Sequence, residues 1–302
     1  MRFFKLHLLP TSYGRILPPQ GGWPRSNGDW GRVACAAGAC MLVSLLALST
    51  DRVMGSLCRP VHTASTEIGE RRLVTPQVGV SALLNTHSKI CWCQARPILP
   101  TGKVTTRLVL QQGEGLFTVS PGAHGDLVVG VGDWTLRHLG TSFDARRLDD
   151  GTMRFTVREG AISVTGSTTA ILQANQVATS IRGSQALQVK TYTAAQIQDQ
   201  LSWQKGQLTL SSSPLQEAGD EMARYHKTDV RIARAIRDRQ VALNLDLSNL
   251  CNFAHAMHDL YSDVHPFVDE SDPKHPILLL DLPSQHPGYT PLRLAPGPCS
   301  LP

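Results

Sequence analysis

The sequence is poor in aromatic residues and in charge: Phe, Trp and Tyr make up 6% of the 302 residues, and charged residues make up 18%. Turn-forming residues are plentiful by contrast, with 25 glycines and 19 prolines. Few aromatic residues and many glycines favour short strands joined by tight turns over a helical bundle. A chain of this length holds one large domain or two small ones.

Signatures of common catalytic sites are also missing. The sequence contains no Gly-x-Ser-x-Gly motif, no phosphate-binding loop and no dinucleotide fingerprint. His255, His258, His265 and His275 lie near one another in the sequence, but no further ligand can be named that would complete a metal site with them. We therefore expect no metal, no cofactor and no enzymatic activity, apart from one self-cleavage step considered below.

An excess of positive charge is absent from most of the chain. The first 60 residues hold seven of the 29 basic residues and two of the 24 acidic ones, which leaves 22 of each sign in the remainder. A nucleic-acid-binding protein would carry its basic excess on the folded part. We therefore expect no nucleic acid among the partners.

Only one long hydrophobic run is present, from Val33 to Thr50. It holds 18 uncharged residues between Arg32 and Asp51, and a helix of that length spans about 27 Å. The basic amino-terminal side predicts a single-pass membrane protein with its amino end in the cytoplasm and its carboxyl-terminal part on the other side of the membrane. A cleaved signal peptide and a buried helix are the alternatives, although no cleavage site is obvious and the segment before Arg32 is long for a leader. Residues 1–32, rich in proline and glycine, are predicted to be a disordered cytoplasmic tail.

After the hydrophobic run, short apolar alternations follow one another at spacings near ten residues, with glycine between them. This pattern is typical of an all-β sandwich or of a compact, solenoid-like β domain. We predict it over residues 60–192. The runs that show it best are Arg107–Leu110, Leu116–Val119, Leu127–Val129, Phe155–Val157 and Ala161–Thr165.

The pattern changes over residues 203–282, where strands and helices alternate in the order βαββαββ, which is typical of a small α+β domain. One predicted helix runs from Pro214 to His226 with Ser213 as its N-cap, and the other runs from Ser248 to Ser262 with Ser248 as its cap. Residues 283–302 contain six prolines and are predicted to be a loose tail. The strands are expected at Gln207–Leu210, Asp229–Ile232, Val241–Leu245, Pro266–Val268 and Ile277–Leu280.

Seven cysteines are spread over the chain, and five of them would lie beyond the membrane. Cys91 and Cys93 flank Trp92, so both thiols would lie on one face of a strand. Two ligands do not make a structural zinc site. In an oxidising compartment either thiol can enter a disulfide, but the partner cannot be assigned from the sequence.

Six short motifs in order, from Thr66 to Tyr225, resemble the FecR family of transmembrane sigma-factor regulators. Each motif is weak alone, and their order over about 160 residues carries the resemblance. The matching segments are Thr66–Arg72, Leu84–Ser88, Gly113–Val119, Leu139–Phe143 and Val157–Val164, followed by Trp203, Gly206, Leu208, Pro214, Leu215, Glu217, Glu221, Arg224 and Tyr225. The α+β segment resembles the short domain at the amino end of secretins and TonB-dependent receptors.

The resemblance implies an inner-membrane signal transducer. Such a protein relays a signal from an outer-membrane TonB-dependent receptor in iron uptake to an extracytoplasmic-function sigma factor. Residues 60–192 would be the FecR-like domain, and residues 203–282 would contact the signalling domain of the receptor. The family's helical cytoplasmic segment, which contacts the sigma factor, has no counterpart in residues 1–32, and a truncated amino end is one explanation. The alternative is a membrane-anchored periplasmic β-scaffold or binding protein without a signalling role.

Within the motifs, most residues are predicted to be scaffold. Phe117, Phe143 and Trp203 are expected in the core, and Glu114 is expected to accept backbone N–H bonds at a turn, as is Glu159.

Two sites are predicted to have a role beyond scaffold. In relatives, the protein cuts itself at a Gly-Thr bond, so the resemblance names Gly140–Thr141 as a candidate bond; the alternative is a turn glycine followed by a strand. The apolar run Ile277, Leu278, Leu279 and Leu280 is predicted to bind the receptor as an exposed edge strand. Its alternative is a buried central strand, and a helix face of the α+β segment is another contact open to the receptor.

Overall fold

The structure, a computed structural model, describes residues 61–95, 104–121, 125–181, 186–269 and 276–282. All of these belong to one compact unit. The predicted cytoplasmic tail (1–32), membrane span (33–50) and carboxyl-terminal tail (283–302) lie outside the described residues. Inside the described ranges, no helix combines the length and the hydropathy that crossing a membrane requires.

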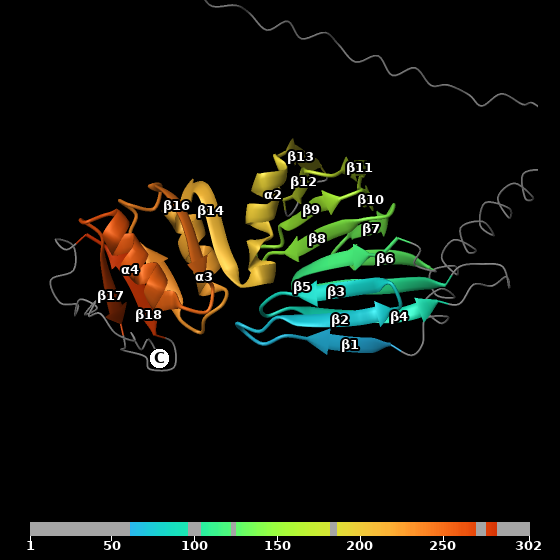
Figure 1. Cartoon of the computed structure of the whole chain (residues 1–302), viewed down its shortest axis with the longest axis horizontal. Helices are drawn as coiled ribbons and strands as arrows, with labels where there is room; N and C mark the ends of the chain where they lie inside the picture. The colour runs from blue at the N-terminus through green and yellow to red at the C-terminus, as the bar shows by residue number, and fades with distance from the viewer. Residues whose placement is uncertain (1–60, 96–103, 122–124, 182–185, 270–275, 283–302) are drawn as a thin grey trace, which may run out of the picture. The chain divides into compact units, whose positions relative to one another are not determined.

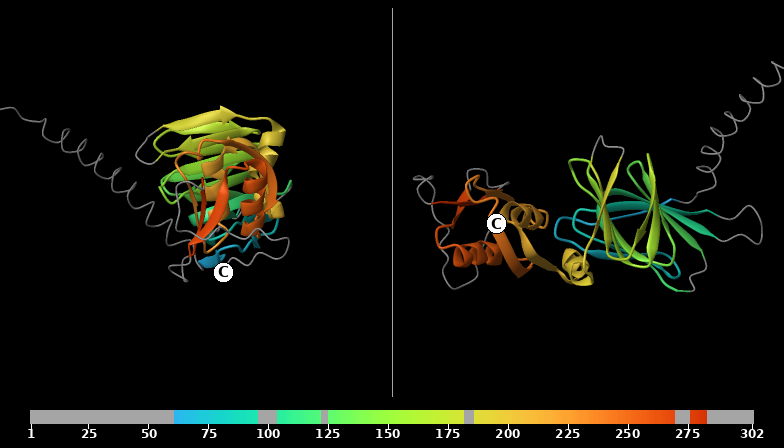
Figure 2. Two further views of the ribbon diagram at one scale, coloured as in Figure 1. Left: turned by 90° about the vertical axis from the view of Figure 1, so that its left-hand side faces the viewer. Right: turned by 90° about the horizontal axis from the view of Figure 1, so that it is seen from above.

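The first part of the described chain is a thirteen-stranded sheet folded into two layers that share strand β5 (Figures 1 and 2). In spatial order the first layer consists of β11 (Thr169–Gln173), β10 (Ala161–Thr165), β7 (Trp134–His138), β6 (Asp126–Val131), β5 (Thr105–Val119), β4 (Lys89–Ala95) and β1 (His62–Ser65). The second layer consists of β13 (Leu187–Thr191), β12 (Gln176–Ser180), β9 (Met153–Glu159), β8 (Ser142–Arg147), β5, β3 (Val80–Leu84) and β2 (Arg72–Gln77).

Strand β5 passes from one layer to the other at Gly113. Its first half pairs with β4 and β6, and its second half pairs with β3 and β8. Gly113 has φ +79°, and a Cβ there would lie 2.3 Å from Ser88 Oγ. Only glycine fits such a backbone and so close an approach, so the bend that creates the two layers depends on this residue.

The apolar residues of both layers meet in one hydrophobic core. Phe117, Phe143 and Phe155 lie side by side on β5, β8 and β9 and have no exposed surface. Phe117 and Phe143 are tilted neighbours with ring centroids 5.4 Å apart. The predictions of a mainly β fold and of core positions for Phe117 and Phe143 are confirmed.

The second part of the described chain has the predicted βαββαββ order, reached through a short helix α2 and a 3-10 turn η1 (Figure 1). Its strands form an antiparallel pair, β14–β16, and a three-stranded sheet, β15–β18–β17. The elements are α2 (Ala194–Gln200), η1 (Ser202–Lys205), β14 (Gln207–Pro214), α3 (Leu215–Ala223), β15 (Asp229–Ile232), β16 (Gln240–Asp246), α4 (Leu250–Leu260), β17 (His265–Asp269) and β18 (Ile277–Asp281).

Both predicted helix caps are wrong by one residue. Helix α3 has Pro214 as its N-cap and no side-chain cap, because Ser213 still belongs to the paired strand β14. Helix α4 is capped by Asn249, whose side chain accepts the N–H of Asn252. Ser248 instead bonds Asp246 in the preceding turn. Short polar side chains compete for such positions, and spacing alone does not decide between neighbours.

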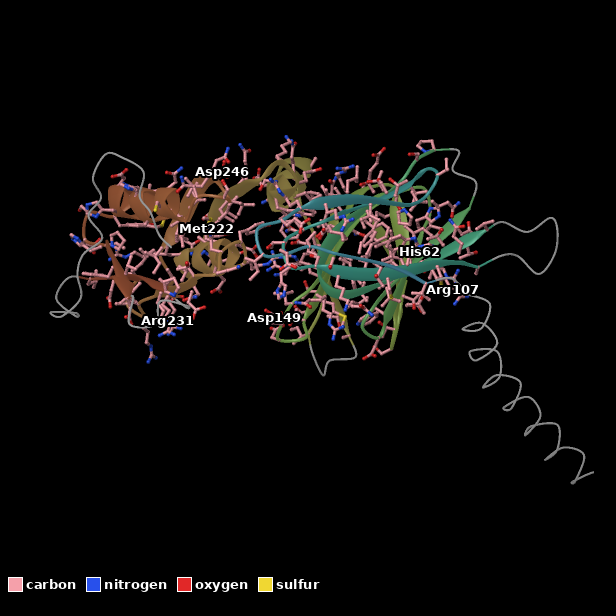
Figure 3. The ribbon with its side chains drawn as sticks, turned by 90° about the horizontal axis from the view of Figure 1, so that it is seen from below. His62, Arg107, Asp149, Met222, Arg231 and Asp246 are labelled. Atoms are coloured by element: carbon pink, nitrogen blue, oxygen red, sulfur yellow. The ribbon has the colours of Figure 1, made fainter. Side chains whose placement is uncertain are left out.

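A second hydrophobic core joins this part to the outer face of the second layer. Met222 lies fully buried inside the α+β part (Figure 3), and Trp203, 5% exposed, belongs to the same cluster. Leu116 and Val177, which point outward from the second layer, are members too. Trp203 is therefore a core residue as predicted, and the two parts share one buried interior at this face.

The two neighbouring cysteines of strand β4 differ in oxidation state. Cys93 and Cys251 each take part in a disulfide, whereas Cys91, on the same strand as Cys93, is a free, half-buried thiol. The adjacent pair Cys91 and Cys93 is therefore divided between two states.

Candidate functional site: a buried ion-pair network

A row of charged side chains crosses the outer face of the second layer, on strands whose inner face is purely apolar. The backbone register places Glu114 opposite Arg146, Arg146 opposite Arg154, and Arg154 opposite Thr179. Because side chains alternate between the faces of a strand, these residues point away from the phenylalanine core. Charged residues on a sheet face that another part of the chain covers need partners.

The partners of this row come from the end of helix α3. Arg224 donates to Glu114 Oε2 over 2.9 Å and to Glu221 Oε2 over 2.8 Å. Glu221 in turn forms an ion pair with Arg146. The carboxylates and guanidinium groups thus alternate in the order Glu114, Arg224, Glu221, Arg146 and connect the strands β5 and β8 with helix α3.

Neutral hydrogen bonds extend this network to strand β3. Asn85 donates from Nδ2 to Glu114 Oε2 over 2.7 Å, and its side chain also bonds the hydroxyl of Tyr225 at 2.7 Å and 2.9 Å. Thr86 receives the N–H of Gly69 and donates its hydroxyl to the carbonyl of Arg224 over 3.0 Å. A loop, two strands and a helix end are therefore held by one set of bonds.

Burial and charge together set the protonation of the two glutamates. Burial opposes the ionisation of Glu114, but Arg224 and Arg146 outweigh it and hold its pKa below the ordinary value. Burial opposes the ionisation of Glu221 as well, but Arg146 and Arg224 lower the pKa to about 2. Both carboxylates are therefore ionised at neutral pH.

Asp144 behaves in the opposite way. Its side chain is 1% exposed, and Oδ2 has no hydrogen-bond partner. Burial, and next the nearby charge of Glu114, raise its pKa well above the ordinary value. A desolvated carboxyl beside an ionised carboxylate keeps its proton to higher pH than a free one does, so Asp144 behaves as the opposite of Glu114 and Glu221.

Burial also perturbs Tyr225. Its pKa is raised because the hydroxyl is desolvated and lies near the charge of Glu114. The phenol therefore remains a neutral hydrogen-bond partner of Asn85.

Four of the six sequence motifs meet in this network. Thr66–Arg72, Leu84–Ser88 and Gly113–Val119 contribute to it, and so does the tract from Trp203 to Tyr225. Arg71, for example, donates to the carbonyl of Trp203 over 2.7 Å.

The prediction for Glu114 was wrong in its partners. The carboxylate accepts from the side chains of Asn85 and Arg224, not from backbone N–H groups at a turn. Sequence reasoning also missed Asp144, Arg146 and Arg154. The signal that could have shown them is alternation: on β8, Asp144 and Arg146 alternate with the buried Phe143 and Ala145, and on β9 Arg154 precedes the buried Phe155.

The other two motifs meet at Gly140–Thr141. Gly140 has φ +84°, and a Cβ on Gly160 would lie 2.1 Å from the carbonyl oxygen of Gly140. The hydroxyl of Thr141 is buried and has no hydrogen-bond partner. His138 accepts the N–H of Gly140 at Nδ1 over 3.3 Å. The segment before the bond is exposed, with Leu139 at 60%.

The predicted edge position of Ile277, Leu278, Leu279 and Leu280 is wrong. These residues form β18, which lies between β15 and β17 in its sheet. Both sides of the strand are hydrogen-bonded, parallel to β15 and antiparallel to β17. The continuous apolar run is explained by burial, since Leu278 and Leu280 have no exposed surface. A partner strand cannot add to β18.

Comparison with known proteins gives a match for a stretch of the thirteen-stranded sheet. Residues 62–163, roughly a third of the chain, match the family model described as FecR protein. Two crystal structures of a "putative anti-sigma factor" from Parabacteroides distasonis ATCC 8503, at 1.65 Å and 2.50 Å resolution, have a similar fold. Each has a TM-score of 0.57 and 19% sequence identity, and the match covers 73% of this chain and 99% of the other. No curated protein sequence matches the chain.

Proposed function

From the premise that residues 62–163 form a FecR domain, we propose that this protein regulates a sigma factor. The fold similarity to the anti-sigma structures extends past the FecR domain and supports this proposal. The observation that carries it is the network that joins the FecR domain to the α+β part. A regulator that receives a signal in one part and transmits it through another needs such a physical connection.

The finer proposal is a relay across the cell envelope. The uncharged run before the FecR domain would anchor the chain in the inner membrane, with the described residues in the periplasm. The α+β part, residues 203–282, would bind the signalling domain of an outer-membrane TonB-dependent receptor. Because β18 is paired on both sides, a receptor strand would have to use an outer strand of the module or a helix face instead.

A scaffold or binding protein without a signalling role is the alternative. It would use the same FecR domain and the same network to present a surface in the periplasm. The two hypotheses differ in whether changes in this protein alter transcription, and genetics therefore separates them.

The test is transcript profiling of cells that lack the gene, of complemented cells, and of cells that carry a Glu114→Gln variant. We expect one set of genes to change on deletion, and a second deletion, of a single sigma-factor gene, to abolish that change. Glu114→Gln should shift the same set of genes while the membrane fraction retains the protein. An unchanged transcriptome on deletion contradicts the proposal and favours the scaffold.

A second candidate activity, self-cleavage at Gly140–Thr141, is favoured by the unpartnered hydroxyl of Thr141. The Thr141 oxygen would attack the Gly140 carbonyl carbon, the C–N bond would break, and the hydroxyl proton would pass to the released amine. Water would then hydrolyse the ester to a Gly140 carboxylate and a free hydroxyl. The positive φ of Gly140 and the close contact of its carbonyl with Gly160 hold the bond in a conformation that other residues resist.

Intact-mass spectrometry of the purified chain tests this activity. We expect two fragments, the second beginning at Thr141, and we expect Thr141→Ser to retain them and Thr141→Val to abolish them. Ser142→Ala is the matched control, because that neighbouring hydroxyl already bonds Thr118. A chain that stays intact, or a Thr141→Val variant that is still cut, removes the activity from this site.

A further inference from the structure

A cavity of about 370 Å³ opens beside the ion-pair network. Arg146, Arg154 and Glu114 line it from the second layer, and Trp203 lines it from η1. Hydroxyl and amide side chains of α2, η1 and β14 complete the wall, among them Gln196, Gln200, Ser202, Thr209 and Ser211. The walls therefore offer many hydrogen-bond donors and acceptors in a space of the size that small molecules occupy.

Arg154 is the unusual residue of this cavity. It lies directly opposite Arg146 on the neighbouring strand, and two like charges in such a position repel each other. Arg146 is neutralised by Glu221. Arg154 has no carboxylate within ion-pair distance among the residues that the structure describes. Its Nε is buried without a hydrogen-bond acceptor.

The arginines beside the cavity differ in their partners. Arg146 forms an ion pair with Glu221, and Arg224 forms one with Glu114, whereas Arg154 has no ion pair in the part of the chain that the structure describes. An arginine without a partner in a partly buried setting is unfavourable unless an anion neutralises it.

Two further polar atoms lack partners at the same cavity. The indole N–H of Trp203, a residue only 5% exposed, has no acceptor, and Oε1 of Gln200 has no donor. Native proteins rarely leave buried polar side-chain atoms unbonded, and a molecule bound in the cavity would supply both missing partners.

The remaining carboxylates at the cavity limit the charge of an occupant. Asp199 and Glu217 line it as well, and Asp199 accepts a bond from Ser211 over 2.6 Å. One unpaired arginine facing these acids suits an occupant with one negative charge and disfavours one with two. The planar guanidinium of arginine matches the two oxygens of a carboxylate.

We propose that this cavity binds a small molecule bearing one carboxylate, which pairs with Arg154 while its remainder bonds the hydroxyl and amide side chains around it. The site lies between the FecR domain and the α+β part, next to Glu114 and Glu221. A molecule bound in the cavity would therefore change the surroundings of the same charged groups that connect the two parts. The inference does not depend on regulation of a sigma factor.

The experiment measures acetate binding to the purified full-length chain by isothermal titration calorimetry at constant ionic strength, with inorganic phosphate as the competing anion class. We expect saturable acetate binding that Arg154→Gln weakens at least about tenfold, as loss of a charge-assisted pair predicts. Arg154→Lys keeps the positive charge but loses the planar guanidinium that can bond both oxygens of a carboxylate, and it should give an intermediate affinity. Arg158→Gln is the matched control: it lies on the same strand, does not line the cavity, and should bind as the parent does.

Thermal unfolding verifies that each variant is folded. Arg154→Gln removes an unpaired cation and should melt at or above the parent temperature. If it does not fold, the lowered affinity of Arg154→Lys is the deciding result. Absence of saturable acetate binding, equal binding by Arg154→Gln, or tighter binding of phosphate than of acetate each overturns the proposal.

Discussion

The two faces of the second layer are built from the same strands, but the inner face is apolar and the outer face carries a row of charged side chains. Facing inward, Phe117, Phe143 and Phe155 pack with no exposed surface. Facing outward, Glu114, Arg146 and Arg154 form a charged row that the α+β part covers. Apolar contact is less directional than an ion pair, whereas a buried ion pair requires its partner in one position. The inner face therefore accounts for stability, and the outer face fixes where helix α3 docks.

The largest effect should come from the inner face. Phe117→Ala removes a fully buried ring that contacts Phe143. We expect the free energy of unfolding to fall by about 3–5 kcal/mol, because transfer and cavity terms add. Chemical denaturation measures it. An unchanged midpoint would show that this face is not the main source of stability.

The next effect should come from breaking the charged row at one end. Glu114→Gln leaves Arg224 without one of its two carboxylates, while the amide still accepts from Asn85. We expect a loss of about 2–3 kcal/mol, smaller than that of the ring, since Arg224 keeps Glu221 as a partner while the network retains one positive charge without its counter-charge. Proteolysis during partial unfolding should cut first between the FecR domain and helix α3. A loss below that of a surface variant would mean that this face contributes no more than solvent-exposed pairs.

A gain in stability is expected at Asp144. Its pKa is raised by burial and by Glu114, so between the unfolded value of 3.8 and the higher folded value the native state binds more protons. The free energy of unfolding therefore falls as the pH rises through this window. Asp144→Asn removes the dependence and should stabilise the protein at pH 7 by about 1.4 kcal/mol for each pH unit between 3.8 and the folded pKa or pH 7, whichever is lower. Melting temperatures of both proteins from pH 4 to pH 8 measure it, and parallel curves would contradict it.

The smallest effect should come from a charged pair outside both faces. Arg231 and Asp229 lie 3.7 Å apart, with side chains 62% and 68% exposed. Arg231→Ala should change the free energy of unfolding by at most about 0.5 kcal/mol, because water and salt screen such pairs. Denaturation at low and high salt measures it. A loss comparable with that of Glu114→Gln would remove the distinction between buried and exposed charges.

The inner face could be predicted from the sequence, and the outer face could not. Apolar alternation locates the strands, and the motif residues Phe117, Phe143 and Trp203 are core residues as expected. The partners of Glu114 lie 29 and 110 residues away at Asn85 and Arg224. No local pattern encodes which distant charges meet, because that depends on how the layers fold and where α3 docks.

The position of a strand within its sheet could not be predicted from the sequence for the same reason. The run Ile277–Leu280 has the composition of either an edge or a central strand, and pairing with β15 and β17 makes it central. The order of the strands in the sequence does not determine the position of β18 in the sheet. The strand β15, which precedes β17 in the sequence, pairs in parallel with β18 on the side opposite to β17.

A double-mutant cycle on Glu114 and Arg224 tests the central claim most directly, namely that the buried pair couples the FecR domain to the α+β part. The free energies of unfolding of the parent, Glu114→Gln, Arg224→Gln and the double variant are measured under one set of conditions. We predict that the free energy of unfolding of the double variant falls by about 1–3 kcal/mol less than the two single losses added together, as for residues that share one buried bond. Additive losses, within about 0.5 kcal/mol, would show that the two residues act independently and would contradict the account.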